Sequence, residues 1–138
     1  MVPVIYHGSC LCDSITFDIE GEPEKVFSCY CLDCAKNSGG PYQLVAKYDV
    51  SKITVKDPQN AQAVWIVSQT QSGFEKHKVF CRQCGCTLWT IPMHHQGLKI
   101  MVRTSLVNGG LEQWQPQAAL FTDCQPRWMR HTLDGKLR

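Results

Sequence analysis

The residues of this chain best suited to chemistry are its cysteines. Eight of the nine lie in three short clusters, and only Cys124 stands apart. One or two residues between cysteines let neighbouring thiolates bind one metal ion without straining the backbone. The sequence therefore predicts a zinc protein whose function lies at its zinc sites. The clustered residues are Cys10 and Cys12, then Cys29, Cys31 and Cys34, and then Cys81, Cys84 and Cys86.

The first and last clusters predict a closed structural site. Residues i and i+2 of an extended strand point to the same side, so Cys10 and Cys12 can bind one ion together. Cys81-x-x-Cys84-Gly85 has the pattern of half a zinc ribbon, in which the glycine tolerates the positive φ that such a turn needs. Together the two halves supply four thiolates and leave no open position.

The middle cluster predicts a different kind of site. Cys29, Cys31 and Cys34 lie within six residues, which we interpret as one loop that supplies three ligands. Three protein ligands and a free fourth position are the pattern of catalytic zinc. Alternatively, Cys86 or a histidine completes the site and makes it structural, and the spacing does not decide between the two. The adjacent His94 and His95 would face opposite sides of a strand and could not both join one site.

The elements that position these clusters are expected to be mostly strands. The candidate segments are short, rich in β-branched and aromatic residues, and separated by Gly, Pro, Asn and Asp. No segment keeps an apolar period of 3.6, so we expect little helix beyond a turn or two within residues 105–114. Residues 35–42 are expected to form a turn between two strands. The expected strands are residues 15–19, 26–28, 42–48, 53–55, 63–67, 79–80, 88–90 and 98–102.

Length and composition indicate a single zinc-binding domain over residues 1–138. The chain is 43% hydrophobic and 19% charged, which is typical of a globular protein. Its formal net charge of +2 favours neither nucleic acid nor a membrane as a partner. Residues 1–7 lack the features of a signal peptide, so we expect a cytoplasmic protein with reduced thiols. The four tryptophans are expected in the core or against the sheets: Trp65, Trp89, Trp114 and Trp128.

Three ordered motifs resemble those of a known family. They are Gly8-x-Cys10-x-Cys12-x-x-Ile15-x-Phe17, Cys29-x-Cys31-x-x-Cys34-x-Lys36-x-x-Gly39 and Phe80-Cys81-x-x-Cys84-Gly85-x-x-Leu88. Together they are similar to the glutathione-dependent formaldehyde-activating enzyme family, which includes centromere-protein-V-like proteins. The resemblance implies a β-tent-type zinc fold of small stacked antiparallel sheets. It also implies the same division of cysteines, with a structural site at Cys10, Cys12, Cys81 and Cys84 and a catalytic site at Cys29, Cys31 and Cys34.

The chain departs from the family pattern beside the middle cluster. Tyr30 stands where the family usually has histidine, Ala35 where arginine is common, and Cys86 where Thr or Ser is usual. The first two changes remove a possible proton carrier and a possible anion anchor. The named family reaction joins formaldehyde and glutathione to S-hydroxymethylglutathione. We therefore expect the zinc chemistry to remain while the substrate becomes a larger conjugate of glutathione or another thiol.

The leading hypothesis is a zinc-dependent carbon–sulfur lyase, or its reverse, a thiol-adduct synthase. It has two Zn²⁺ per chain, one structural and one catalytic, and acts on glutathione or a glutathione-conjugated small molecule. Three thiolates make zinc a soft Lewis acid that suits sulfur. Tyr30 is the candidate catalytic residue for proton transfer, ahead of Asp33. The alternatives are a non-catalytic zinc-stabilised interaction module and a redox sensor that uses Cys86 and Cys124.

Overall fold

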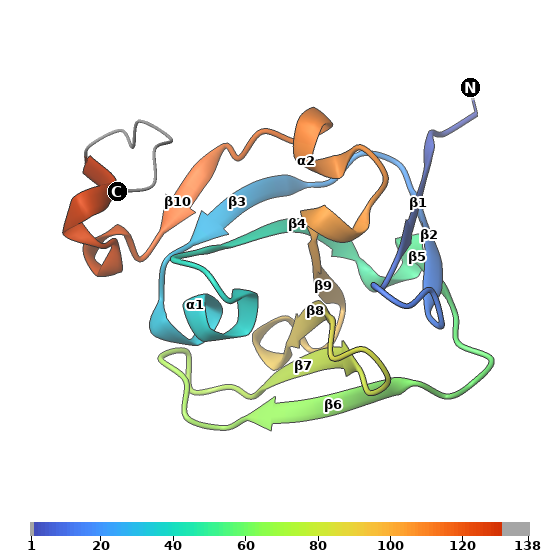
Figure 1. Cartoon of the computed structure of the whole chain (residues 1–138), viewed down its shortest axis with the longest axis horizontal. Helices are drawn as coiled ribbons and strands as arrows, with labels where there is room; N and C mark the ends of the chain where they lie inside the picture. Colours follow the sequence, from blue (N-terminus) through green and yellow to red (C-terminus); the bar gives the residue numbers. More distant parts are fainter. Residues whose placement is uncertain (1, 131–138) are drawn as a thin grey trace, which may run out of the picture.

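The computed structural model describes residues 2–130, which form ten strands in two sheets (Figure 1). The smaller sheet has the order β1-β2-β5, and the larger has the order β10-β3-β4-β9-β8-β7-β6. Only β10 and β3 pair in parallel; the other neighbours in the described sheets are antiparallel. The strands are β1 (Ile5–Ser9), β2 (Thr16–Glu20), β3 (Lys25–Cys29), β4 (Gln43–Asp49), β5 (Ile53–Lys56), β6 (Gln62–Val67), β7 (Lys76–Cys81), β8 (Thr87–Pro92), β9 (Lys99–Arg103) and β10 (Ala118–Leu120).

The expected mainly β fold with little helix is confirmed. All eight expected strands are present, as β2 to β9, and a 3-10 turn (Thr104–Leu106) and helix α2 (Gly110–Gln113) fall near the expected helical turns. The larger sheet, with seven strands and one parallel pair, is neither small nor wholly antiparallel. No helix in residues 2–130 is long and apolar enough to cross a membrane.

Helix α1 (Leu32–Ser38) covers residues 35–38 of the expected turn 35–42, so the expectation is wrong for these residues. The helix begins after Cys31, whose Sγ accepts a hydrogen bond from the backbone N–H of Cys34 at 3.3 Å. It ends at Gly39, which has a φ of 76° and donates its backbone N–H to the carbonyl of Ala35. No residue of α1 is fully buried, so the helix carries no apolar stripe from which a period of 3.6 could be recognised.

The two faces of the larger sheet have different neighbours. Side chains alternate between the faces along a strand, so adjacent residues of β3, β4, β8 and β9 serve different faces. One face packs against the smaller sheet, where Trp89 meets Phe17 edge to face with ring centroids 5.4 Å apart. The other face lines a cavity beside α1. Core-facing residues include Val26, Ala46, Trp89, Ile100 and Val102. Cavity-facing residues include Phe27, Val45, Thr90, Met101, Lys76 and Lys78.

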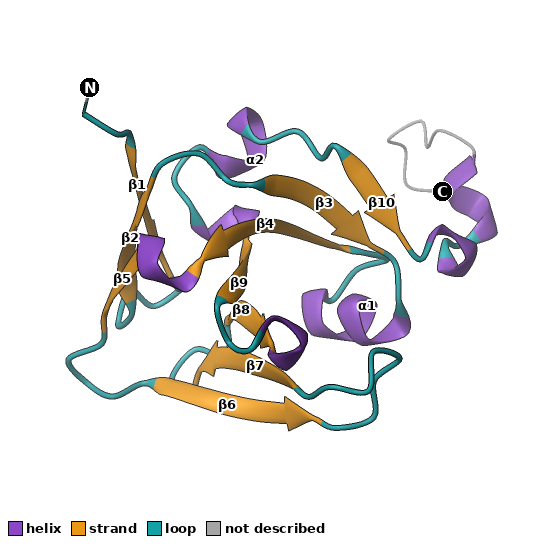
Figure 2. Ribbon diagram, turned by 180° about the vertical axis from the view of Figure 1, so that it is seen from behind, coloured by secondary structure: helices purple, strands orange, loops and turns teal. Residues whose placement is uncertain are grey.

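Helix α1 occupies the space between the strands β3 and β4 and the strands β6 and β7 (Figure 2). It therefore lies on the cavity side of the larger sheet. Two of the tryptophans, Trp89 and Trp114, are buried as expected. The expectation is wrong for Trp65, which is 68% exposed, and for Trp128, which is 54% exposed. Trp65 belongs to β6, one of the two edge strands of the larger sheet, so it has a strand on one side only.

Candidate metal centres and the adjoining cavities

The first and last cysteine clusters meet in space. The Sγ atoms of Cys10, Cys12, Cys81 and Cys84 all lie within 4.8 Å of one another. Cys12 Sγ is 3.7 Å from Cys10 Sγ and 3.8 Å from Cys81 Sγ. A tetrahedral zinc site with Zn–S bonds of about 2.3 Å has an edge of about 3.8 Å between sulfurs. The donor set and its spacing therefore fit a closed four-thiolate zinc site.

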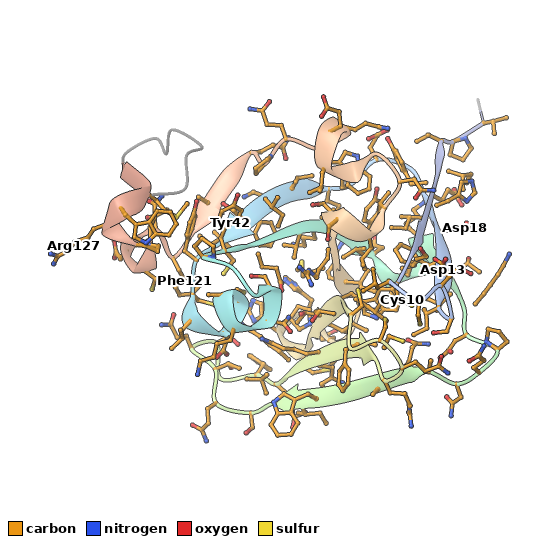
Figure 3. All side chains as sticks on the ribbon, in the orientation of Figure 1. Cys10, Asp13, Asp18, Tyr42, Phe121 and Arg127 are labelled. Atoms are coloured by element: carbon orange, nitrogen blue, oxygen red, sulfur yellow. The ribbon has the colours of Figure 1, made fainter. Side chains whose placement is uncertain are left out.

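Two tight turns bring these thiols together. Between β1 and β2, the N–H of Cys10 donates to Ile15 O at 3.0 Å, and Asp13 adopts a φ of 63° (Figure 3). After β7, the N–H of Gly85 donates to Cys81 O at 2.8 Å, and Gly85 has a φ of 75°. Gly85 therefore adopts the positive φ that the motif predicts. Cys10 and Cys81 are buried, whereas Cys12 is exposed.

Ser14 is part of this cluster, which sequence reasoning missed. Its Oγ lies 3.0 Å from Cys12 Sγ and 3.4 Å from Cys81 Sγ, so the hydroxyl can donate to either thiolate. Burial acts to raise the pKa of Cys81, but hydrogen bonds from Ser14 and from the backbone lower it to about 6. A thiolate is the form that binds metal, and this environment favours it. The signal in the sequence was a hydroxyl two residues beyond the C-x-C pair.

The middle cluster also comes together, but not on one loop as expected. Cys29 ends β3, Cys31 precedes α1 as its N-cap, and Cys34 lies within α1. Their three Sγ atoms lie within 4.8 Å of one another. A hydrogen bond with Cys34 lowers the pKa of Cys29 to about 6 against the effect of burial, and the charge of Lys76 acts in the same direction. The same hydrogen bond, together with burial, raises the pKa of Cys34. Cys29 therefore loses its proton more readily than Cys34.

No fourth protein ligand accompanies the middle cluster within residues 2–130. No further cysteine, histidine or carboxylate there places a ligand atom within 4.8 Å of all three thiols. Cys86, the alternative ligand, packs against the core and donates its thiol to its neighbour's carbonyl, Thr87 O, at 3.6 Å. The donor set of three thiols fits a zinc ion with one open position.

Two of these thiols, Cys29 and Cys34, open into a cavity of about 310 Å³. Its floor is the face of the larger sheet that points away from the smaller sheet. His94 and His95 both line this cavity, so the expectation that they face opposite sides is wrong. They belong to a 3-10 turn (Met93–His95) rather than a strand, and consecutive residues of such a turn are not on opposite faces. Burial, assisted by the charge of Lys47, lowers the pKa of His95, which therefore stays neutral at neutral pH.

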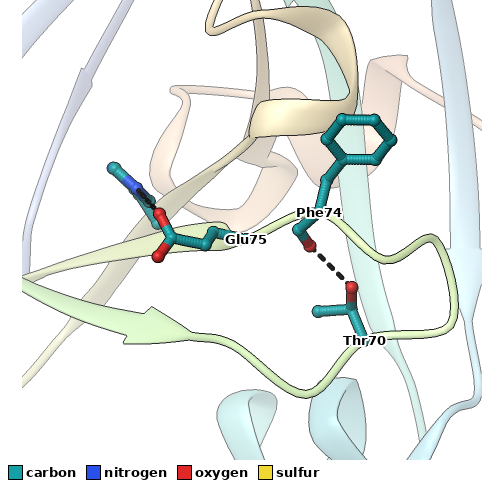
Figure 4. A network of polar contacts seen from close by, with 4 residues as sticks. Thr70, Phe74 and Glu75 are labelled. Atoms are coloured by element: carbon teal, nitrogen blue, oxygen red, sulfur yellow. Dashed lines mark hydrogen bonds and ion pairs between the residues drawn. The ribbon is translucent and has the colours of Figure 1, made fainter.

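A second cavity, of about 590 Å³, opens at Cys31. The loop between β6 and β7 forms part of its wall through Gln69, Thr70, Gln71 and Ser72. That loop is closed by a hydrogen bond from Thr70 Oγ1 to Phe74 O at 2.6 Å (Figure 4). The two cavities share four lining residues, so the middle cluster lies between them. The shared residues are Asp33, Ser72, Lys76 and Phe121.

The remaining candidate residues lie around these cavities. Tyr30 packs its ring against Tyr42 with centroids 5.1 Å apart, and it lines neither of the two cavities. Asp33 lines both. Cys124 is exposed and lines the second cavity together with Cys31, although it belongs to neither cysteine cluster. The two candidate metal centres have no thiol in common. In Figure 3, Phe121, which lines both cavities, lies near α1 and apart from Cys10.

We expect Cys86 and Cys124 to be dispensable for metal binding. Neither thiol lies in a cluster, so the Cys86→Ala, Cys124→Ala double variant should bind as much zinc as the parent. The measurement is metal analysis of protein purified with zinc, checked against thiol titration. A loss of one zinc per chain would show that one of the two is a ligand, and the two single variants would then identify it.

The fold and its two cysteine clusters define a mainly β protein with one closed and one open candidate metal site. The sequence model of the glutathione-dependent formaldehyde-activating enzyme family matches residues 5–124, and the chain belongs to this family. The resemblance predicted from the motifs is confirmed. The family is enzymatic, and its glutathione-dependent activation of formaldehyde forms a carbon–sulfur bond.

The fold is also similar to a solved structure. The crystal structure of a Rhodobacter sphaeroides protein, a structural genomics target, superimposes with a TM-score of 0.58 at 16% sequence identity. The match covers 82% of this chain and 98% of that one, and it shows the fold alone. No curated protein matches this chain.

Proposed function

We propose that this protein is a zinc-dependent carbon–sulfur lyase, or the reverse thiol-adduct synthase, acting on a conjugate of glutathione or a related thiol. The observation that carries the proposal is the middle cluster. Three thiols lie within 4.8 Å of one another, and two of them open into a cavity large enough for a small molecule. In this proposal the chain binds two zinc ions, one at each cluster.

The residues of the middle cluster would perform complementary tasks. A zinc ion held by Cys29, Cys31 and Cys34 would supply a Lewis acid with an open position at which a substrate sulfur would be stabilised as thiolate. The adjoining cavities would hold the two parts of the conjugate on either side of that sulfur. Their shared wall includes the ammonium group of Lys76, which adds positive charge beside the cluster.

The reaction needs no oxidant or reductant. In cleavage the carbon–sulfur bond breaks and the sulfur keeps the electron pair. A neighbouring hydroxyl loses its proton to give C=O, or a neighbouring C–H loses its proton to give C=C. In synthesis the thiolate attacks that carbon, and the oxygen or the neighbouring carbon takes up a proton. Both directions therefore need one group that carries a proton.

Tyr30 is our proposed proton carrier, because it lies between two of the three ligands in the chain. We expect Tyr30→Phe to lower kcat by about 100-fold, the smaller end of the usual effect of a general acid or base, without changing zinc content. The measurement is turnover of the best adduct across pH. Asp33→Asn is the comparison, since Asp33 lines both cavities. If Asp33→Asn loses most of its turnover while Tyr30→Phe remains fully active, Asp33 rather than Tyr30 carries the proton.

The proposed function is tested with zinc-reconstituted protein and a panel of glutathione adducts. The panel contains S-hydroxymethylglutathione and the adducts of larger aldehydes and of unsaturated ketones. Thiol release is followed with a thiol-reactive dye, and adduct formation by mass spectrometry. We expect at least one adduct to be cleaved or formed faster than with metal-stripped protein. A parent that neither makes nor breaks any adduct, and whose middle zinc resists exchange with added thiols, contradicts the proposal.

A non-catalytic interaction module is the second candidate. The observation that favours it is the edge strand β6, which exposes three consecutive apolar side chains, Val64, Trp65 and Ile66. Exposed apolar groups on an unpaired strand edge are typical of surfaces that bind another chain. In this case both zinc ions would be structural, and the adduct panel would show no turnover.

A further inference from the structure

We infer that the group attached to sulfur in the substrate is apolar, larger than one carbon and negatively charged. It would occupy the 310 Å³ cavity, with its anionic substituent at Lys76 and Lys78. This inference rests on the proposed function and names the class of conjugate that the site accepts. The substrate class is a thiol conjugate in which a saturated carbon, attached to sulfur, carries an apolar alkyl or aryl group with a carboxylate.

The size and the walls of the cavity support the apolar part. Its volume falls within the range of about 300–1,000 Å³ typical of small-molecule pockets, and a hydroxymethyl group would leave most of it empty. Most of the surface that lines the cavity is apolar, and covering apolar surface so that it leaves water is favourable. The aliphatic and aromatic side chains of the walls are Phe27, Val45, Pro92, Met101, Leu120 and Phe121.

Two ammonium groups line the cavity against one carboxylate, that of Asp33, and this excess supports the negative charge of the occupant. Within residues 2–130, no carboxylate lies within 4.0 Å of Lys76 or Lys78, whereas Lys99 is paired with both Glu24 and Asp49. Lys78 donates only to a backbone carbonyl, that of Asp33, at 3.5 Å. Both lysines are half-buried, and a charge beside apolar walls interacts strongly with an opposite charge. His95 cannot take this role at neutral pH, because burial lowers its pKa.

The floor of the cavity adds polar groups close to these lysines. Gln43 is 4% exposed and lines the cavity, and its Oε1 accepts from Asn37 Nδ2 at 2.9 Å. Its amide N–H groups have no partner within the described residues and can donate to an occupant. Thr90 is also buried on this floor. An acceptor-rich substituent such as a carboxylate matches this set of donors.

The second cavity can hold the peptide part of the conjugate, so the first cavity remains for the group attached to sulfur. Its wall at Gln69, Thr70, Gln71 and Ser72 is polar, which suits the amide and carboxylate groups of a peptide such as glutathione. Cys31 lines this cavity, and Cys29 and Cys34 line the other. A sulfur placed between them would direct the peptide to the polar side and the attached group to the apolar side.

The inference is tested by binding rather than turnover, using three stable thioethers and zinc-replete protein. The probes are S-methylglutathione, S-(4-carbamoylbenzyl)glutathione and S-(4-carboxybenzyl)glutathione, measured by calorimetry. The two benzyl probes have nearly the same shape and differ in charge. We expect the carboxylate to bind at least about tenfold tighter than the carboxamide, as one charge-assisted contact implies, and both to bind tighter than S-methylglutathione. Equal affinity for all three probes, or no binding of any, would overturn the inference.

Substitutions test which residues cause the preference for the carboxylate probe. Lys76→Met, Lys78→Met should remove the preference for the carboxylate, and Lys56→Met, an exposed lysine on β5, should retain it. If the two lysines only balance the charge of the thiolates, the double variant will weaken the binding of both benzyl probes equally. That result would contradict the anionic part of the inference. Met101→Trp should weaken the binding of both benzyl probes and leave the affinity for S-methylglutathione unchanged. Gln69→Trp, in the second cavity, should weaken all three.

The outcome is separable from that of the proposed function. Thioethers that bind as expected to a protein without turnover would uphold the cavity assignment and refute the lyase. Turnover of small adducts, together with equal affinity for the three thioethers, would support the lyase and refute the cavity assignment. Melting curves of each variant exclude loss of fold as the cause, and the comparison of probes on the parent protein needs no variant at all.

Discussion

Replacing Cys81 with serine is expected to leave the protein insoluble or without fixed tertiary structure. Cys81 is 0% exposed and is one of four thiols that join segments 69 residues apart in the sequence. Structural zinc sites contribute apparent free energies of about 10–16 kcal/mol, which equals or exceeds the usual 5–15 kcal/mol of net stability. The measurements are soluble yield, near-UV circular dichroism and zinc content.

Cys124→Ser is the matched control, because Cys124 is exposed and belongs to neither cluster. Its melting curve and zinc content should equal those of the parent. Cys84→Ser should behave as Cys81→Ser does, although its side chain is less buried. A soluble, zinc-replete Cys81→Ser protein that melts at the temperature of the parent would refute the structural assignment of this site.

Replacing Cys31 with serine is expected to abolish turnover while the fold survives. Serine is a good N-cap, so its Oγ can accept the hydrogen bond from the N–H of Cys34 that Cys31 Sγ accepts now. The helix therefore keeps its start while the middle site loses one of three thiolates. We expect one zinc fewer per chain and a fall in kcat/KM of at least about 100-fold.

The measurements are the adduct panel, metal analysis and a melting curve of each protein. Cys31→Ala is the comparison, because it removes both the ligand and the cap and should melt lower than Cys31→Ser. Cys124→Ser again serves as the cysteine control for zinc content and melting, because Cys124 belongs to neither cluster. Undiminished turnover in Cys31→Ser would show that the middle cluster is not the place where sulfur reacts.

The strands were predictable because their residues alternate in a local pattern. The segment 15–19, for example, alternates apolar and polar side chains, and the structure has β2 at Thr16–Glu20. The division of the cysteines was predictable as well, since a C-x-C pair and a C-x-x-C-Gly turn each set their own geometry. Cys29, Cys31 and Cys34 could be grouped from their spacing alone, and the structure brings their thiols together.

Other features depend on contacts between distant residues. The strand β10 has three residues and exists through its parallel pairing with β3, from Ala118 opposite Phe27 to Leu120 opposite Cys29. No local sequence pattern predicts so short a strand. Helix α1 has no apolar stripe, so only its ends, Cys31 and Gly39, carried a signal. The cavities are formed by side chains from several strands, which sequence reasoning could not assemble.

The alternation of side chains across the larger sheet has a consequence for how such a protein can change over generations. Along β3, Val26 belongs to the core and its neighbour Phe27 to the cavity; along β9, Ile100 and Val102 belong to the core and Met101 to the cavity. A mutation at an apolar cavity position such as Phe27 or Met101 leaves the packing between the sheets in place and replaces none of the clustered thiols. New substrate preferences can therefore accumulate on one side of a strand while selection for a folded protein acts on the other. A library restricted to residues 27, 45 and 101 would explore that freedom directly.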